Sequence, residues 1–180
     1  MSRVISKRAA ATRVALLEAA LEEFSAFGFR RTSMESVARR AGVSRATLYL
    51  YWKSKDALFR DLVEQTHEDQ VAAMELVYAE EPGDFEHRLL AMLEARFLRF
   101  IELTSASPHA AELFDLHGRL CGDVALASQE RSEKLIAKLI RASCPVNGFV
   151  LDPLMGSGTT PVVAKKLRRS SGTYSPMRSR

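Results

Sequence analysis

Side chains that donate hydrogen bonds or carry positive charge are concentrated between residues 31 and 55. Ser44, Arg45 and Thr47 open a short predicted helix in this stretch, and Tyr49 follows one turn after Arg45. An α-helix fits the major groove of double-stranded DNA, and the residues at its N-terminal end reach the edges of the bases. The residue types and their spacing therefore predict a helix that contacts DNA.

Four further side chains flank this helix where the phosphates of DNA would pass. Thr32 and Ser33 open the preceding predicted helix, and Lys53 and Lys55 follow the DNA-contacting one. Hydroxyl and ammonium groups contact phosphate oxygens, and such contacts position a protein on DNA without reading its sequence. We expect these four side chains to contact phosphate.

A first helix is needed to support these two. Val14, Leu17, Leu21 and Phe24 recur at helical spacing and predict an amphipathic helix of about four turns. Gly28 ends it, because glycine readily takes the left-handed conformation that follows a helix.

The two short helices are marked by capping residues and a glycine. Thr32 and Glu35 fit a capping box that starts the second helix, and Ser44 caps the third. Gly42 between them suits a tight turn. Two short helices joined in this way form a helix-turn-helix.

Residues 31–58 resemble the DNA-binding domain of TetR-family transcriptional regulators. The resemblance rests on Ala-Gly-Val-Ser at 41–44, Thr-Leu-Tyr at 47–49 and Lys-Ser-Lys-Asp at 53–56, all in register. It implies that the following side chains face DNA: Thr32, Ser33, Ser44, Arg45, Thr47, Tyr49, Tyr51 and Lys55.

Two positions depart mildly from the family pattern. The family often has Gly where Ala46 stands and Phe where Trp52 stands. We expect Trp52 to lie in the core. The rings of Tyr49 and Tyr51 are expected to pack as well, with their hydroxyl groups turned toward phosphate.

The middle of the chain predicts further helices over about residues 55–78, 85–103 and 109–141. The last can be one helix or two, with Gly118 and Gly122 as its weak points. The TetR resemblance extends over residues 10–143 or so and implies a helical effector and dimerisation domain here. Its candidate effector-pocket residues are Met92, Phe97, Phe100 and His117. The alternative for the apolar three is ordinary core packing.

The C-terminal part has a different pattern. Residues 149–151 read as a strand, and a Gly-rich loop and a short helix over 161–167 follow. The stretch 150–160, with sequence VLDPLMGSGTT, resembles motif I of S-adenosylmethionine-dependent DNA N4-cytosine and N6-adenine methyltransferases. By this resemblance, which covers about residues 129–169, the residues at the cofactor would be Asp152, Gly156 and Gly158.

We nevertheless expect no enzyme and no bound cofactor. Residues 170–180 contain no Asp or Glu to hold the ribose of a cofactor, and the Pro-Pro motif that carries catalysis in that family occurs nowhere in the chain. A truncated, fused or frame-shifted reading frame would explain the segment. A surface loop in an intact regulator is the other explanation.

Composition agrees with a DNA-binding module attached to an acidic body. The 180 residues are 47% hydrophobic with a net charge of +4. Residues 1–60 carry a net +7, residues 61–144 a net −8 and residues 145–180 a net +5. A basic segment suits a polyanionic partner such as DNA.

Other classes of site and location are not expected. The chain has only two cysteines, which excludes a disulfide-stapled scaffold, and no apolar run as long as a membrane helix. His109, Glu112, Asp115 and His117 do not share one helical face, so we expect no metal site.

These observations predict an all-α protein. We expect a helix-turn-helix domain at 1–54, a helical and incomplete effector and dimerisation domain at 55–143, a strand-loop-helix segment at 144–169 and a disordered tail at 170–180. The expected function is that of a cytoplasmic, homodimeric TetR-type regulator, most simply a repressor, that binds a double-stranded operator and is released by a small-molecule effector. The alternative is a truncated or fused frame that carries a methyltransferase remnant.

Overall fold

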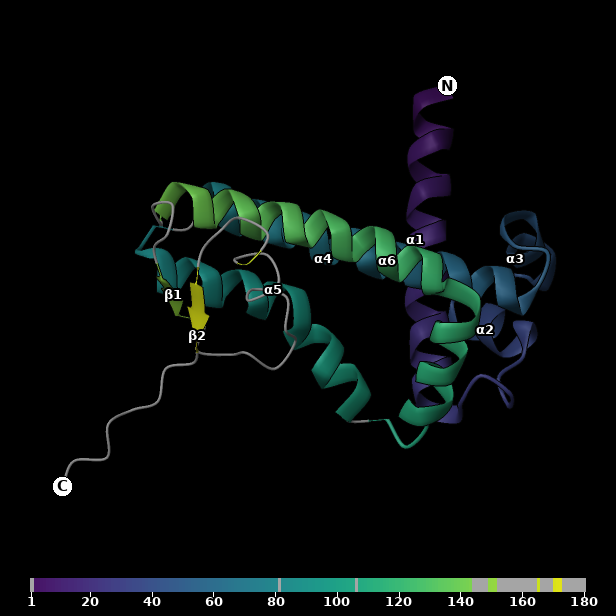
Figure 1. Cartoon of the computed structure of the whole chain (residues 1–180). Helices are drawn as coiled ribbons and strands as arrows, with labels where there is room; N and C mark the ends of the chain where they lie inside the picture. The colour runs from purple at the N-terminus through teal and green to yellow at the C-terminus, as the bar shows by residue number, and fades with distance from the viewer. Residues whose placement is uncertain are drawn as a thin grey trace. The chain divides into compact units, whose positions relative to one another are not determined.

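The computed structural model of the chain contains six helices and two short strands in its described residues (Figure 1). Described are residues 2–80, 82–105, 107–143, 149–151, 165 and 170–172, of which 2–7, 99–105 and the two strands are described for their backbone alone. The elements are α1 (Ser2–Phe27), α2 (Met34–Arg40), α3 (Arg45–Tyr51), α4 (Lys55–Glu80), α5 (Phe85–Ser105), α6 (Ala110–Ser143), β1 (Phe149–Leu151) and β2 (Ser170–Gly172). The fold is all-α, as predicted.

The chain divides into two compact units. The first contains residues 1–67 and 100–124, and the second contains residues 68–99 and 125–180. Helices α4, α5 and α6 therefore contribute residues to both units. None of the described helices combines the length and the apolar character needed to cross a bilayer.

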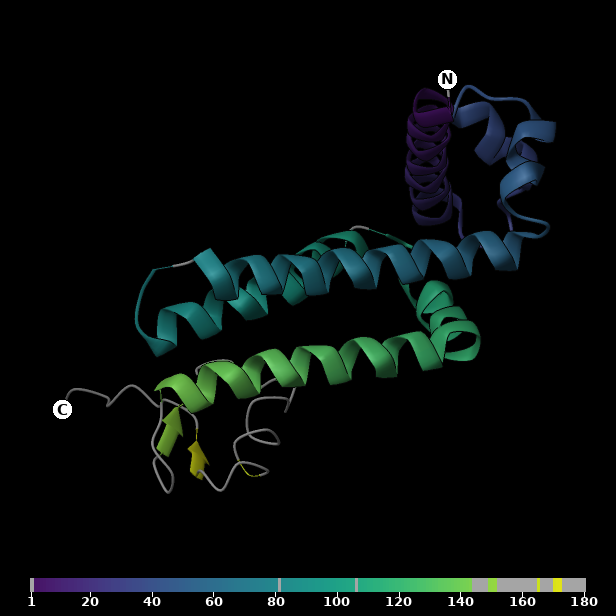
Figure 2. The same ribbon diagram turned by 90° about the horizontal axis from the view of Figure 1, so that it is seen from above.

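The first unit is built around α1, with α2 and α3 together on one side of it (Figure 2). Leu16, Phe24, Val37, Leu48 and Leu58 bring α1 to α4 into one buried cluster. Burial of such side chains is the main favourable contribution to the folding of the unit. Helix α1 is much longer than the four turns predicted, because no Gly or Pro interrupts its first half.

The start of α2 lies one residue later than predicted. Ser33, not Thr32, is the N-cap: its Oγ accepts a hydrogen bond from the N–H of Ser36 at 3.0 Å, and the Oγ of Ser36 accepts one from the N–H of Ser33 at 3.2 Å. The capping box therefore pairs Ser33 with Ser36 instead of Thr32 with Glu35. Thr32 is unavailable because its hydroxyl bonds inward, to the carbonyl oxygen of Gly28 at 2.8 Å.

Helix α6 is bent at Cys121, whose backbone leaves the helical region with φ −134° and ψ 19°. The predicted weak points, Gly118 and Gly122, flank this residue. The bend is bridged by Arg60 of α4, which donates to the carbonyl oxygen of Leu120 at 2.7 Å and forms an ion pair with Asp123. Of the two predicted alternatives, the structure has two helical segments joined without a loop.

The core of the second unit lies between the far halves of α4 and α6 and helix α5, which run side by side (Figures 1 and 2). It contains Val71 and Met74 from α4, Leu89 and Met92 from α5, and Ile140 among others from α6. All five of these side chains are fully buried.

The two strands belong to the second unit and pair in parallel, with Phe149 opposite Ser170 and Leu151 opposite Gly172. Strand β1 covers the three residues predicted as a strand. The predicted loop and the helix over 161–167 lie outside the described residues, apart from residue 165. Strand β2 occupies the first three residues of the tail that we expected to be disordered, which corrects that expectation for 170–172.

Candidate nucleic-acid interface

The turn between α2 and α3 sets the angle at which α3 leaves the body of the first unit. Gly42 has φ +67°, a left-handed conformation that favours glycine. The N–H of Val43 donates to the carbonyl oxygen of Ala38 at 3.0 Å, which closes the turn. Ala38 is buried, and its small side chain lets the two helices approach each other. The predicted helix-turn-helix is therefore present.

The inner face of α3 is held by Leu48 and by the adjacent Trp52. Leu48 is fully buried, and the indole Nε1 of Trp52 donates to Asp61 Oδ2 of α4 at 2.8 Å. Asp61 also binds Arg13 of α1 through Nη2, at 2.5 Å from Oδ1. Trp52 lies in the core, as expected. The orientation of α3 is thus fixed against both α1 and α4.

The outer face of α3 is centred on Ala46 and Leu50. Both side chains are exposed, and Leu50 is 80% exposed. Neither residue is among the predicted contacts, all of which have polar side chains. The signal that could have found them is the helical period, since positions 46 and 50 lie on the face opposite Leu48.

Ser44, Arg45, Thr47 and Tyr49 lie at the start of α3 and along its flank, as predicted. The Oγ of Ser44 caps the helix by accepting from the N–H of Thr47 at 3.0 Å. Arg45 forms an ion pair with Glu35 of α2 and lies over the Tyr49 ring. Hydrogen bonding to Tyr49 and the nearby Glu35 raise the pKa of the Arg45 guanidinium, which therefore stays charged.

Two of the predicted DNA contacts are turned into the protein instead. Thr32 is only 3% exposed, and its hydroxyl bonds to backbone carbonyl oxygens. The ammonium of Lys55 donates to the carbonyl oxygens of Phe29 at 2.6 Å and Thr32 at 2.8 Å, and it lies 4.4 Å from the centre of the Phe29 ring. Both side chains hold the loop between α1 and α2.

The remaining predicted contacts are Ser33 and Tyr51, of which Ser33 is exposed and Tyr51 is partly buried. Ser33 is exposed at the start of α2. The ring of Tyr51 packs against the core, as expected, but its hydroxyl donates to the carbonyl oxygen of Ala9 in α1 at 3.1 Å. That hydroxyl is therefore engaged within the protein rather than turned outward as a donor.

Exposed cations are present in and next to the helix-turn-helix. Arg31, Arg39 and Lys53 are exposed around the two short helices. Arg40, in contrast, is bound to Glu22 and Glu23 of α1. The first unit therefore combines an outward-facing helix with exposed positive charge in the same module, and both features suit a duplex.

The helix-turn-helix and the helices that support it match a known protein family. Residues 16–62 match the model of the bacterial regulatory proteins of the tetR family, and this segment contains α2, α3 and the parts of α1 and α4 that pack on them. Residues 16–62 belong to the TetR family. The family predicted from the motif at 31–58 is thereby confirmed.

Relatives of the TetR type extend beyond this segment. The chain is 31% identical over 133 residues to the transcriptional regulator AcrR of Shigella flexneri, covering 72% of this chain and 60% of AcrR. It is 30% identical over 145 residues to RutR of Escherichia coli K12, covering 81% of this chain and 65% of RutR. The chain thus spans less than two thirds of the length of these regulators.

Solved TetR-family structures have a similar fold. A regulator of Shewanella sp. PV-4 matches with a TM-score of 0.53 at 25% identity, over 73% of this chain and 69% of the other. A regulator of Marinobacter aquaeolei VT8 matches with a TM-score of 0.60 over 91% of this chain and 87% of the other, and at 19% identity this likeness concerns the fold alone.

The chain is also similar to a methyltransferase, which agrees with the resemblance of residues 150–160 to methyltransferase motif I. The type II methyltransferase M1.MboII of Moraxella bovis is 44% identical over 72 residues, which cover 30% of this chain and 28% of the methyltransferase. The motif residues Asp152, Gly156 and Gly158 lie outside the described residues.

The candidate effector-pocket residues of the TetR resemblance are divided between the units. Met92 is fully buried in the core of the second unit, and Phe97 packs against that core. His117 belongs to the first unit, where its Nε2 lies 3.1 Å from Nε2 of His67. The side chain of Phe100 lies outside the described residues.

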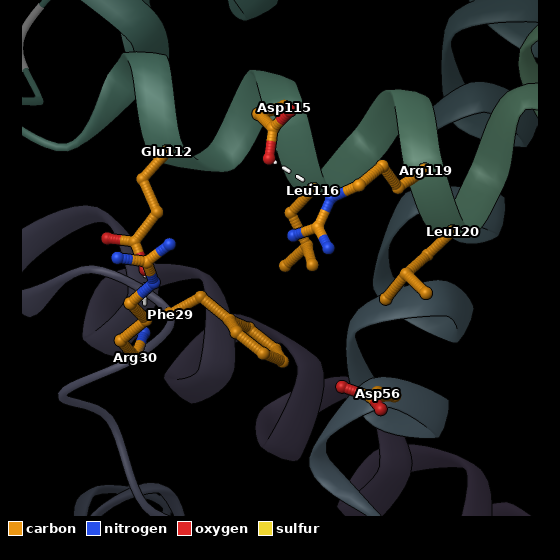
Figure 3. A pocket seen from close by; sticks show the side chains of 8 residues that line it. All are labelled: Phe29, Arg30, Asp56, Glu112, Asp115, Leu116, Arg119 and Leu120. Atoms are coloured by element: carbon orange, nitrogen blue, oxygen red, sulfur yellow. Dashed lines mark hydrogen bonds and ion pairs between the residues drawn. The ribbon is translucent and has the colours of Figure 1, made fainter.

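A pocket of about 470 Å³ lies within the first unit, and none of these four candidates lines it. Its floor is apolar, with Phe29, Leu116 and Leu120, and its rim carries the ion pair of Asp115 with Arg119 (Figure 3). Both members of this ion pair are exposed to solvent.

Proposed function

We propose that this chain is a sequence-specific DNA-binding transcriptional regulator of the TetR type, with α3 in the major groove. The single observation that carries the proposal is the placement of α3. Its inner face is held by Leu48 and Trp52, while its outer face is open to solvent. A helix held in this way can enter the groove as a rigid body.

The charge distribution supports the same target. Residues 1–60 carry a net +7, whereas residues 61–144 carry a net −8. DNA is therefore attracted to residues 1–60 and repelled by residues 61–144. A regulator of this kind works where chromosomal DNA lies, which in bacteria is the cytoplasm.

We further propose that the chain acts as a homodimer that binds two half-sites, and that a small apolar effector bound in the second unit releases it from DNA. Met92 and Phe97 are the candidate effector contacts, because both lie at the core of that unit. Release of the operator by an effector would make the chain a repressor in the simplest case.

Selection of binding sites from a random duplex library with the full chain tests the proposal. We expect enrichment of a pseudo-palindrome with half-sites about one helical turn apart. A single enriched half-site would contradict the dimer, and the absence of any enriched sequence would contradict the regulator itself.

The match to M1.MboII supports the alternative of a truncated or fused frame that carries a methyltransferase remnant, and the question is whether that remnant is active. Transfer of a tritiated methyl group from S-adenosylmethionine to DNA tests it. We expect no transfer, because the chain has no Pro-Pro motif. Transfer above background that is lost in Asp152→Ala would instead assign the activity to the C-terminal segment.

A further inference from the structure

The centre of the outer face of α3 is apolar. Leu50 is 80% exposed, and the methyl group of Ala46 is exposed one turn before it. Leu48 fixes this orientation, because a rotation of about 100° per residue places positions 46 and 50 each about 160° from the buried side. Together, Ala46 and Leu50 give the outward-facing side of this helix an apolar centre.

The polar side chains of α3 are bound to other groups of the protein. Arg45 is paired with Glu35, and the hydroxyls of Ser44 and Thr47 bond to each other at 2.9 Å. The hydroxyl of Tyr51 donates to Ala9. These bonds use part of the hydrogen-bonding capacity of the polar groups, whereas Ala46 and Leu50 offer an apolar surface that no other described group of the protein covers.

The major groove offers one apolar group to such a surface, the C5 methyl of thymine. Resting on the proposed DNA-binding function, we propose that Ala46 and Leu50 read thymine methyl groups and so determine part of the operator sequence. The net charge of +7 on residues 1–60, among which Arg31, Arg39 and Lys53 are exposed, favours DNA as the occupant of this face over an apolar protein surface or a second copy of this chain.

The spacing of the two residues predicts the spacing of the thymines. Positions 46 and 50 are separated by about 6 Å along the helix axis. Successive base pairs of DNA are about 3.4 Å apart. Each half-site should therefore carry two thymines, on either strand, within about two base-pair steps of each other.

The experiment uses the full chain and the operator selected from the random library. Each thymine is replaced in turn by deoxyuridine, which pairs identically but lacks the methyl group, and the dissociation constant is measured by fluorescence anisotropy. We expect a loss of about fourfold at each methyl that is read, the factor that corresponds to one buried methyl group. Replacement of the same thymine by 5-methylcytosine, paired with guanine, should retain part of the affinity.

Leu50→Ala should remove the sensitivity to deoxyuridine at one position of each half-site and leave the other position unchanged. Leu126→Ala is the matched control, because Leu126 is 65% exposed but lies on α6 in the second unit. This control should keep the full pattern of sensitivities.

An enriched operator that binds equally well with thymine or deoxyuridine at every position would overturn the inference and leave the proposed function standing. Equal sensitivity of the wild type and Leu50→Ala would overturn it too. A change of oligomeric state in Leu50→Ala without DNA would assign the face to a second copy instead. If no sequence is enriched, the proposed function fails, and the inference fails with it.

Discussion

The ammonium of Lys55 lies 2.8 Å from the carbonyl oxygen of Thr32, and the two residues are joined by this bond inside the first unit. The chemistry of both side chains predicts contacts with DNA. Instead, Lys55 binds the backbone of the loop that leads from α1 into α2, and burial lowers the pKa of its ammonium. A motif lysine that is expected to bind phosphate thus serves to hold the helix-turn-helix in place.

Lys55→Ala is therefore expected to reduce stability. The variant loses hydrogen bonds from a charged group to the carbonyl oxygens of Phe29 and Thr32, which we expect to lower the free energy of unfolding by about 1–2 kcal/mol. Urea unfolding followed by circular dichroism measures this change. Unchanged stability together with a smaller dependence of DNA binding on salt would restore Lys55 as a phosphate contact.

Lys53→Ala is expected to act on DNA binding instead. Lys53 is exposed two residues before Lys55. Loss of one phosphate contact should weaken binding to all sequences alike and reduce the slope of log K against log salt by about 1. Binding titrations of a random and a selected duplex between low and moderate salt measure both effects.

Lys134→Ala is the matched control for this variant, since Lys134 is an exposed lysine of α6 in the second unit. Its slope should equal that of the wild type. An equal slope in Lys53→Ala would remove Lys53 from the interface.

Gly28→Ala is expected to disturb the contact between α6 and the end of α1. Gly28 has φ +78°, and a Cβ there would lie 2.5 Å from Glu112 Oε2 and 3.0 Å from His109 Nδ1. Glu112 is held in place by the N–H of Arg30 at 2.8 Å, so it cannot move without losing that bond. We expect a cost of about 1 kcal/mol from the backbone conformation and about 1–3 kcal/mol more from the close contacts.

Gly42→Ala separates these two contributions. Gly42 also has a positive φ, +67°, but a Cβ there would meet no atom within 4 Å. It should lose only the backbone contribution of about 1 kcal/mol. Equal losses of unfolding free energy in the two variants would show that the contact of Gly28 with α6 is unimportant.

The stability of the protein is expected to fall as the pH drops below about 6.5. Burial lowers the pKa of His117, so the unfolded chain takes up this proton more readily than the folded one. The contribution of His117 is complete above its ordinary pKa and is lost as the pH falls toward the lowered value. The close approach of its Nε2 to that of His67 also leaves room for only one proton between the two rings.

Melting temperatures between pH 5.5 and 7.5 measure this dependence. In His117→Gln the decline should be shallower by a few degrees, because the titrating ring is removed. His87→Gln, a change at an exposed histidine of α5, should retain the decline of the wild type. A decline in His117→Gln as steep as that of the wild type would contradict the role of His117.

Features of the fold that depend only on residues close together in the chain, such as turns and helix starts, could be predicted from the sequence. Gly42 and Ser44 marked the turn and the start of α3, because a positive φ and a side-chain cap are requirements of the backbone alone. The helical spacing of apolar residues likewise predicted an all-α fold. The motif at 31–58 was sufficient to predict the family that the match at residues 16–62 confirms.

The direction of individual side chains could not be read in the same way. Thr32 and Lys55 have the chemistry of phosphate contacts, yet the carbonyl oxygens of the loop between α1 and α2 bind both. Leu50 has the chemistry of a core residue, yet Leu48 occupies the inner position of α3. Which face of a short helix is buried depends on what packs against it, and those partners are distant in the sequence.

That three helices form a helix-turn-helix with an excess of positive charge follows from local signals, because caps, glycines and periodicity act over a few residues. Which residues of that module face outward follows from packing between helices that are distant in the chain. The bond from Trp52, at the end of α3, to Asp61 of α4 and the bond from Arg13 of α1 to the same carboxylate orient the helix. Ala46 and Leu50 are therefore presented to solvent, while Lys55 is bound inside.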